Sequence, residues 1–515
     1  MANNIYLQKS NGIERQKVIL IGIDGADYHI TKKFIEEDKL PNLKKIAEEG
    51  IYSKLKSTIP PLSPSAWTSI FTGCTPAKHG IYGFTKRRKD SYFPRPISSK
   101  DRKVDVIWNI LSRHGKRCIL INIPFSYPPE KINGIMITGL GTPSKDSNFV
   151  YPPEYKRIIL EEFPDYDVDF GEDTIDKRKP NSVLPKIDKV TNAQIELTKK
   201  LFVEEDWDFF VSVFRSLDVI QHFFINDLEK ILMYYEVIDN FIGWILSNID
   251  LNNTTLIICS DHGFSYSHTN FNVNAWLRER GYIKVKRNIH IKDRALPSIE
   301  FIRRILARSN TGRKILYKAK NSNISKYILK LLPSSDINVN KIDWSKTKAY
   351  FWDGSFGLIY LNLKGREPEG IVEISERDKI IDEIISDIKR LREPKTGKCP
   401  VRAVFKGSDF YNSNDIDIPD IILLGNDGYC LKSGVTENIF IKREVYPGVH
   451  DIDGVFFAIG SKIKKSNVRV SDVTDIVPLI LSIFNIKPSH QQLKLKILKM
   501  KNTIRIRKLY SQKRS

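Results

Sequence analysis

The chain has 515 residues, of which 41% are hydrophobic and 28% charged, so it is long enough for about two or three globular domains. No apolar run approaches the roughly 18–20 residues that span a bilayer, and residues 1–18 lack the apolar stretch of a signal peptide. Five scattered cysteines with no CxxC pair argue against a disulfide scaffold and favour a reducing compartment. We therefore expect a cytoplasmic protein.

The net charge of +21 is concentrated in two segments. Residues 282–332 carry fourteen Lys and Arg against two acids, and residues 491–515 carry nine Lys and Arg and no acid. These net charges of +12 and +9 account for the whole excess, so the rest of the chain is neutral on balance. Basic segments favour anionic membrane surfaces or phosphate-rich polymers, but a solvated helix face and a frayed tail would explain them equally well.

Apolar runs that are typical of buried strands alternate along the chain with helical patterns. The expected strands are 17–23, 118–123, 209–214, 255–260, 420–424 and 455–459, and the expected helices are 31–49, 65–72, 104–113, 187–203, 226–248 and 473–486. This alternation predicts an α/β fold with a mostly parallel central sheet flanked by helices. Ligands of such sheets bind at the carboxyl ends of strands, so we expect the chemistry just after each apolar run.

The composition also predicts how the chain is divided. The expected segments are a first part of the core (1–281), a basic helical insertion or cap (282–345), the remainder of the core with cap-like strands (346–490) and a basic tail (491–515). In the tail, Leu493, Ile497, Met500 and Ile504 repeat at helical spacing among basic residues, as in amphipathic helices on anionic bilayers. We expect peripheral contact with the inner membrane face through 282–332 and 491–515, and we favour a membrane over nucleic acid as the partner.

Acidic and histidine side chains gather where the predicted strands and turns end. They are Asp24 after the first run, Asp218 and His222 after the third, Asp261 and His262 after the fourth, and His450 in a glycine-punctuated turn. Carboxylate oxygens and imidazole nitrogens bind zinc and related divalent ions. Each residue alone would more often be a turn former or a structural histidine. Together they are enough for two ions, and a pair of ions about 3.5–4 Å apart suits phosphoryl transfer.

Two serines are candidates for the nucleophile of such a reaction. Ser63 and Ser65 stand at the start of the predicted helix 65–72. A metal can activate a hydroxyl, and a helix N-terminus offers free backbone N–H groups to a phosphate. Either serine could instead be the helix N-cap. The spacing alone does not decide between Ser63 and Ser65.

With these residues in view, the chain resembles the type I phosphodiesterase/nucleotide pyrophosphatase family of the alkaline phosphatase superfamily, in its prokaryotic branch. The matching segments are 18–27, 40–84, 216–224, 258–264, 272–283, 357–372 and 448–460. The resemblance implies an alkaline-phosphatase-like core and a hydrolase that cleaves phosphodiester or pyrophosphate bonds. It also implies two divalent metal ions as cofactors, with zinc expected first and manganese as the alternative.

The same resemblance implies roles for individual residues. It makes Ser63 the nucleophile, transiently phosphorylated or nucleotidylated. Asp24, Asp261 and His262 would bind one metal together with Ser63, and Asp218, His222 and His450 would bind the second metal. Phe84 stands where nucleotide pyrophosphatases of the family often carry a phosphate-contacting Asn, which argues against that specificity in particular. The substrate is expected to be a small-molecule or lipid-linked phosphoester.

Several alternatives and secondary residues follow from the same comparison. Ser63 is followed by Pro-Ser-Ala-Trp, which does not fit the sulfatase motif. A phosphomonoesterase or phosphotransferase of the superfamily stays an alternative, as does a basic membrane-binding or nucleic-acid-binding protein on this scaffold. Arg215 and His268 are candidate substrate contacts. We favour a salt-bridge role for Arg215, place His268 in a loop past the metal ligands, and expect His79 to be structural.

Overall fold

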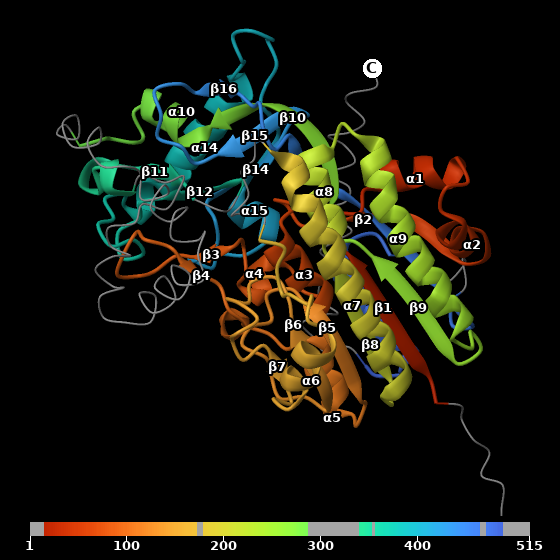
Figure 1. The fold of residues 1–515 in the computed structure, drawn as a ribbon. Helices are drawn as coiled ribbons and strands as arrows, with labels where there is room; N and C mark the ends of the chain where they lie inside the picture. The colour runs from red at the N-terminus through yellow and green to blue at the C-terminus, as the bar shows by residue number, and fades with distance from the viewer. Residues whose placement is uncertain (1–14, 172–178, 287–338, 353–355, 464–469, 488–515) are drawn as a thin grey trace, which may run out of the picture.

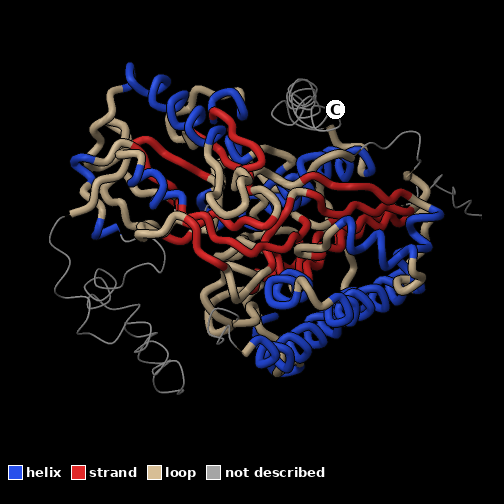
Figure 2. Tube along the Cα trace, turned by 90° about the horizontal axis from the view of Figure 1, so that it is seen from above, coloured by secondary structure: helices blue, strands red, loops and turns tan. Residues whose placement is uncertain are grey.

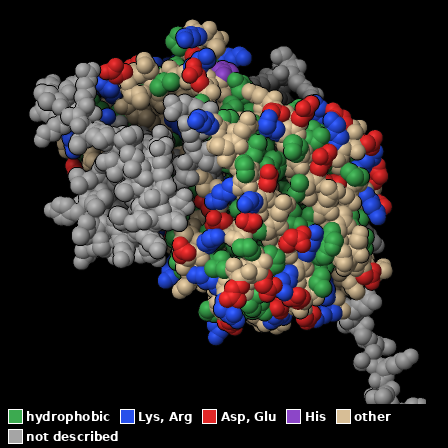
Figure 3. All heavy atoms as spheres, in the orientation of Figure 1, with side chains coloured by type: hydrophobic (Ala, Val, Ile, Leu, Met, Phe, Trp, Pro, Cys, Tyr) green, Lys and Arg blue, Asp and Glu red, His purple; other side chains and the backbone are tan. Residues whose placement is uncertain are grey.

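A computed structural model describes residues 15–171, 179–286, 339–352, 356–463 and 470–487. The expected basic helical insertion lies largely within 287–338, and the expected tail lies within 488–515, so both predictions fall outside the described residues. On the face shown in Figure 3, basic and acidic side chains are interspersed over the described surface. Among the helices that the structure describes, none has the length and apolar character needed to cross a membrane.

An eight-stranded sheet with the order β2-β18-β9-β1-β8-β5-β6-β7 forms the centre of the larger lobe (Figure 1). The strands are β1 Lys17–Ile23, β2 Ile51–Lys56, β5 Cys118–Ile123, β6 Gly134–Thr138, β7 Val150–Tyr151, β8 Phe209–Phe214, β9 Thr254–Cys259 and β18 Asp453–Ile459. The neighbours from β9 to β6 pair in parallel, whereas β2–β18, β18–β9 and β6–β7 pair antiparallel. This sheet confirms the expected α/β fold.

Helices cover both faces of this sheet, as the view from above shows (Figure 2). One face packs against α1 Tyr28–Glu36, α2 Pro41–Glu49, α6 Tyr155–Glu162, α7 Leu184–Glu204, α8 Ser216–Phe224 and α9 Leu228–Ser247. The other face packs against α3 Ser63–Thr72, α5 Ile107–Arg113 and α16 Ile476–Ile483. Because β1 is covered on both sides, Ile19 and Ile21 enter one core while Val18 and Leu20 enter the other. A continuous apolar run is the sequence signature of such a strand.

The predicted helix 31–49 is in fact two helices. Helix α1 ends at Glu36, and α2 begins at Pro41 after Leu40, whose backbone is not helical. Proline is accepted in the first turn of a helix, where its missing N–H is not needed, but it disfavours the helical conformation of the residue before it. The break therefore follows from Pro41.

A smaller lobe with its own hydrophobic core is built on a four-stranded antiparallel sheet of order β11-β12-β14-β13 (upper left in Figure 1). Its elements are α10 Val273–Glu279, β11 Ala349–Phe351, β12 Leu358–Leu361, α14 Arg377–Arg390, β13 Val401–Lys406, α15 Gly407–Tyr411 and β14 Ile421–Gly425. The run 420–424 was expected among the central strands, and that expectation is wrong because β14 pairs with β12 and β13. The described residues on either side of segment 287–338 lie side by side in this lobe, since Val285 and Ile342 form a bridge.

Two of the connections between the lobes are strand β10 (Gly263–Asn272) and a hairpin segment. Strand β10 pairs first with β17 (Gly448–Asp451) and then with β15 (Gly428–Lys432) and β16 (Phe440–Lys442). The second is the segment that follows the short helix α4 (Pro76–His79) and forms the hairpin of β3 (Thr85–Lys86) and β4 (Arg95–Pro96). Within it, Tyr92 stacks on Trp344 with ring centroids 3.6 Å apart and donates a hydrogen bond to Asn362. The smaller lobe is thereby held beside the carboxyl ends of β9 and β1.

Candidate active site

The six predicted Asp and His ligands lie at one edge of the central sheet. Asp24 follows β1, Asp261 and His262 follow β9, and Asp218 and His222 lie on α8, which begins directly after β8. Strands β9, β1 and β8 are neighbours, so their carboxyl ends bring these side chains together. His450 was expected in a turn but lies on β17, where it pairs with Phe264 of β10. This pairing brings it to the same edge.

Asp24, Asp261 and His262 form a fully buried group, each with 0% exposure. His262 Nε2 lies 3.6 Å from Asp24 Oδ1 and 3.3 Å from Asp261 Oδ2. Burial, and next the charge of Asp261, raises the pKa of Asp24, and burial also raises the pKa of Asp261. Burial therefore disfavours the negative charges of Asp24 and Asp261, and a bound cation would compensate these charges.

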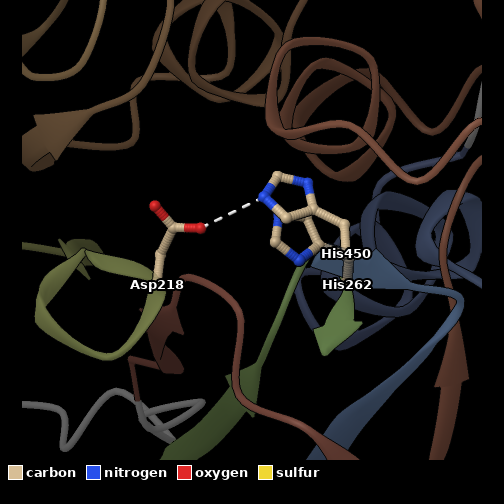
Figure 4. A group of neighbouring side chains, drawn as sticks. All are labelled: Asp218, His262 and His450. Carbon is tan, nitrogen blue, oxygen red and sulfur yellow. Dashed lines mark ion pairs between the residues drawn. The ribbon is translucent and has the colours of Figure 1, made fainter. Parts of the chain in front are cut away.

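A second group is centred on Asp218, which Figure 4 shows together with His450 and His262. Asp218 Oδ1 lies 3.4 Å from His222 Nε2 and 3.3 Å from His450 Nε2. His262 connects the two groups, because its ring stacks on that of His450 with centroids 3.6 Å apart. The six side chains thus form one continuous Asp/His cluster.

The hydrogen bonds of the three histidines define their tautomers. Their Nδ1 atoms lie 3.0–3.1 Å from backbone carbonyls: His222 from Gly448, His262 from Gly263 and His450 from Pro61. A carbonyl accepts, so each Nδ1 carries the proton and each Nε2 of a neutral ring carries a lone pair. The Nε2 atoms of His222 and His450 face each other at 3.0 Å. Two lone pairs at that distance are compatible with a shared cation, and carbonyl-anchored Nδ1 atoms are typical of metal-binding histidines.

The carboxylates show the same need for a cation. Within the described residues, Asp24 Oδ1, Asp218 Oδ1 and Asp261 Oδ2 are buried without a hydrogen-bond donor. Buried carboxylate oxygens without a donor are strongly unfavourable unless a metal or another charge satisfies them. Three imidazole nitrogens and three carboxylate oxygens are ligands that divalent ions such as zinc accept. The residues present therefore fit the implied metals.

The structure also distinguishes the two candidate serines. Ser63 is the first residue of α3, is 2% exposed, and places its Oγ 3.2 Å from His262 Nε2. Ser65 Oγ instead donates to the Leu62 carbonyl at 3.1 Å and contacts Thr58 Oγ1 at 3.0 Å. Leu62 occupies the N-cap position and no side chain caps the helix, so the N-cap interpretation of both serines is wrong. The serine beside the Asp/His cluster is Ser63.

Comparisons with known proteins show the family of the chain. The sequence model of the family described as type I phosphodiesterase / nucleotide pyrophosphatase matches residues 18–453. The chain belongs to this family. The expected membership, and with it the expectation of a phosphoester hydrolase, is confirmed. No curated protein matches the chain.

Solved structures show the same fold at low sequence identity. Phosphonoacetate hydrolase from Sinorhizobium meliloti 1021 is 14% identical, with 91% of this chain and 96% of that chain covered and a TM-score of 0.57. Human ectonucleotide pyrophosphatase/phosphodiesterase 5 is 13% identical, with 92% and 96% covered and a TM-score of 0.51. At such identities the likeness shows the fold alone.

The three secondary residues have different surroundings in this phosphodiesterase-family site. Arg215 pairs with Asp169 at 3.2 Å and lies 3.6 Å from Asp218 Oδ2, so it has a salt-bridge role next to a candidate ligand. His79 is buried, and burial lowers its pKa to about 3, in keeping with a structural role. His268 is exposed on strand β10 rather than in a loop, four residues beyond Phe264. A substrate contact by His268 or Arg215 stays a prediction.

Two side chains in contact with the cluster, Trp67 and Tyr446, were not expected from the sequence. The Trp67 indole donates to Asp24 Oδ2 at 2.9 Å. The Tyr446 ring stacks on His222, with centroids 4.6 Å apart and planes at 11°. The Phe84 ring, which the resemblance places where relatives often carry an Asn, packs edge-on against Phe125. Trp67 stands four residues after Ser63, a spacing that could have indicated it. No local pattern indicates Tyr446.

Proposed function

We propose that the protein is a two-metal phosphoester hydrolase of the phosphodiesterase/pyrophosphatase kind in which Ser63 is the nucleophile. One observation carries this proposal: three histidine lone pairs and three unsatisfied carboxylate oxygens converge beside the Ser63 hydroxyl. Membership of the family supports the class of reaction. A protein that merely bound membranes or nucleic acid would have no use for this buried, charged cluster.

The cluster offers two places for divalent ions. Asp24, Asp261 and His262 would hold one ion next to Ser63. The second ion would be held by Asp218, His222 and His450. Bound there, the ions would neutralise the phosphoryl oxygens and lower the pKa of the attacking and leaving oxygens. We expect zinc first and manganese as the alternative, since Asp/His sites accept several divalent ions.

The residues of the chain position the phosphoryl group and carry out the covalent step. Ser63 Oγ forms a bond to phosphorus while the bond to the leaving oxygen breaks, which leaves a phosphorylated or nucleotidylated serine. Water then cleaves this ester and restores the hydroxyl. Because Ser63 opens α3 and Pro64 has no N–H, the backbone N–H groups of Ser63 and Ser65 would be the ones of the first turn that could serve the phosphoryl oxygens. The Nδ1 bonds of the three histidines keep the rings oriented throughout.

Removal of the metals tests this proposal. We expect the full chain to hydrolyse bis-p-nitrophenyl phosphate faster than p-nitrophenyl phosphate, with Zn²⁺ or Mn²⁺ supplied. A chelator should abolish both rates, and the added metal should restore them. Faster hydrolysis of the monoester would favour the phosphomonoesterase alternative. A rate that persists in metal-free protein, verified by elemental analysis, would contradict the proposal.

A further inference from the structure

One contact of the site involves a residue that is not a metal-ligand type. Trp67 Nε1 donates to Asp24 Oδ2 at 2.9 Å, and both side chains are 0% exposed. The other oxygen, Asp24 Oδ1, has no hydrogen-bond donor within the described part of the chain and lies 3.6 Å from His262 Nε2. The indole therefore holds one oxygen of the carboxylate and leaves the other directed into the Asp/His cluster.

The indole is carried by the same helical turn as the nucleophile. Ser63 and Trp67 are four positions apart on α3, so they lie on one face of the helix. The indole ring of Trp67 stacks on Phe71, with centroids 5.6 Å apart and planes at 20°, and this packing holds it in place. A single rigid element thus sets the place of Ser63 and the orientation of Asp24.

Gly22 makes room for this arrangement. A Cβ atom at Gly22 would lie 2.5 Å from Cη2 and 3.0 Å from Cζ3 of Trp67, which is closer than non-bonded carbon atoms approach. The indole therefore lies directly on strand β1, two residues before Asp24. Glycine weakens the interior of a strand and often marks the close approach of another group, and here that group is the Trp67 ring.

We propose that Trp67 is a positioning residue that orients Asp24 for metal binding, an inference that rests on the proposed function. A carboxylate without this bond could rotate and offer its oxygens in several arrangements. The N–H bond selects one arrangement before the ion arrives. Partners of metal ligands commonly have this effect, and their loss lowers metal affinity by about 10- to 100-fold.

The chain offers a matched pair of tryptophans for the test. Trp108 is also buried, with 1% exposure, and also packs against Phe71, with centroids 5.2 Å apart. Its Nε1 donates to Glu130 Oε2 at 3.0 Å, a carboxylate outside the Asp/His cluster. Trp67→Phe and Trp108→Phe each remove one indole N–H from one carboxylate, which is fully buried at Asp24 and partly exposed at Glu130. We would measure both Zn²⁺ dissociation constants of the metal-free full chain by competition with a chromophoric chelator, and the melting temperature in chelator.

We expect Trp67→Phe to weaken one of the two zinc affinities by about 10- to 100-fold, while Trp108→Phe leaves both unchanged. Both variants should lower the melting temperature of the metal-free protein. A purely structural role of Trp67 would change that temperature alone and leave the zinc affinities unchanged. Unchanged affinities in Trp67→Phe, or equal weakening in Trp108→Phe, would overturn the inference. If the wild-type chain binds neither zinc nor manganese, the proposed function fails together with it. Should Trp67→Phe not fold, β-(3-benzothienyl)alanine at position 67 keeps the ring shape without the N–H, and the same zinc result is required.

Discussion

Ser63→Ala is expected to lower the rate of diester hydrolysis by at least about 10³-fold, because nucleophile removal in covalent catalysis commonly costs more than this. The variant should still fold and bind two metals. The Ser63 side chain is buried at the start of α3, and its Oγ contacts His262. Alanine keeps the Cβ and removes the one atom that can attack phosphorus. Steady-state rates with bis-p-nitrophenyl phosphate and Zn²⁺ measure the effect.

Ser65→Ala is the matched control for this prediction. Ser65 is as buried as Ser63, at 2% exposure, and lies on the same helical turn, but its hydroxyl bonds to Thr58 and Leu62. We expect this variant to keep most of its activity. Loss of activity in Ser65→Ala together with retained activity in Ser63→Ala would show that Ser63 is not the nucleophile, and it would contradict the mechanism.

Asp218→Asn is expected to remove one of two bound metals and to lower the rate by at least about 100-fold, the upper end of what loss of an outer-shell partner costs. Asp218 Oδ1 is the point within 3.4 Å of both His222 Nε2 and His450 Nε2. Asparagine keeps the shape of the side chain but loses its negative charge. Elemental analysis after dialysis would give the number of metals per chain, and the same diester assay would give the rate.

Asp239→Asn controls for the loss of a buried carboxylate as such. Asp239 is 1% exposed and accepts hydrogen bonds from the backbone of Asn42 and Leu43 at the start of α2, away from the Asp/His cluster. We expect a loss of stability of about 1 kcal/mol, the typical value of a hydrogen bond, with both metals retained. Two metals and a wild-type rate in Asp218→Asn would show that the second group is not a metal site.

The parts of the fold that the sequence predicted well are those in which local pattern and burial coincide. The runs 118–123 and 209–214 correspond to β5 and β8 residue for residue, because a strand covered on both faces is mostly apolar, here with one polar residue each, Asn122 and Ser212. The run 420–424 is equally apolar and is a strand, but it belongs to the smaller lobe. Partners far away in the sequence decide which sheet a strand joins, and its own composition does not record them.

The candidate site likewise has residues that the sequence predicts and contacts that it does not. Aspartates and histidines after strands can be predicted, because parallel strands bring their carboxyl ends to one edge. The hydrogen bond between Trp67 and Asp24 joins residues 43 positions apart in the sequence. The stacking of Tyr446 on His222 joins the loop before β17 to α8. Neither has a local pattern. Which of two neighbouring serines faces the cluster depends on the exact start of α3, and element boundaries are the least predictable feature of a sequence.

The stereochemistry of hydrolysis tests the central claim most directly. A phosphorothioate diester of known configuration would be cleaved by the metal-loaded full chain in ¹⁸O-labelled water, and the configuration of the product determined. Attack by Ser63 followed by attack of water requires two in-line displacements, so the account predicts net retention at phosphorus. Net inversion would show that water attacks the substrate directly, and it would contradict the covalent role of Ser63.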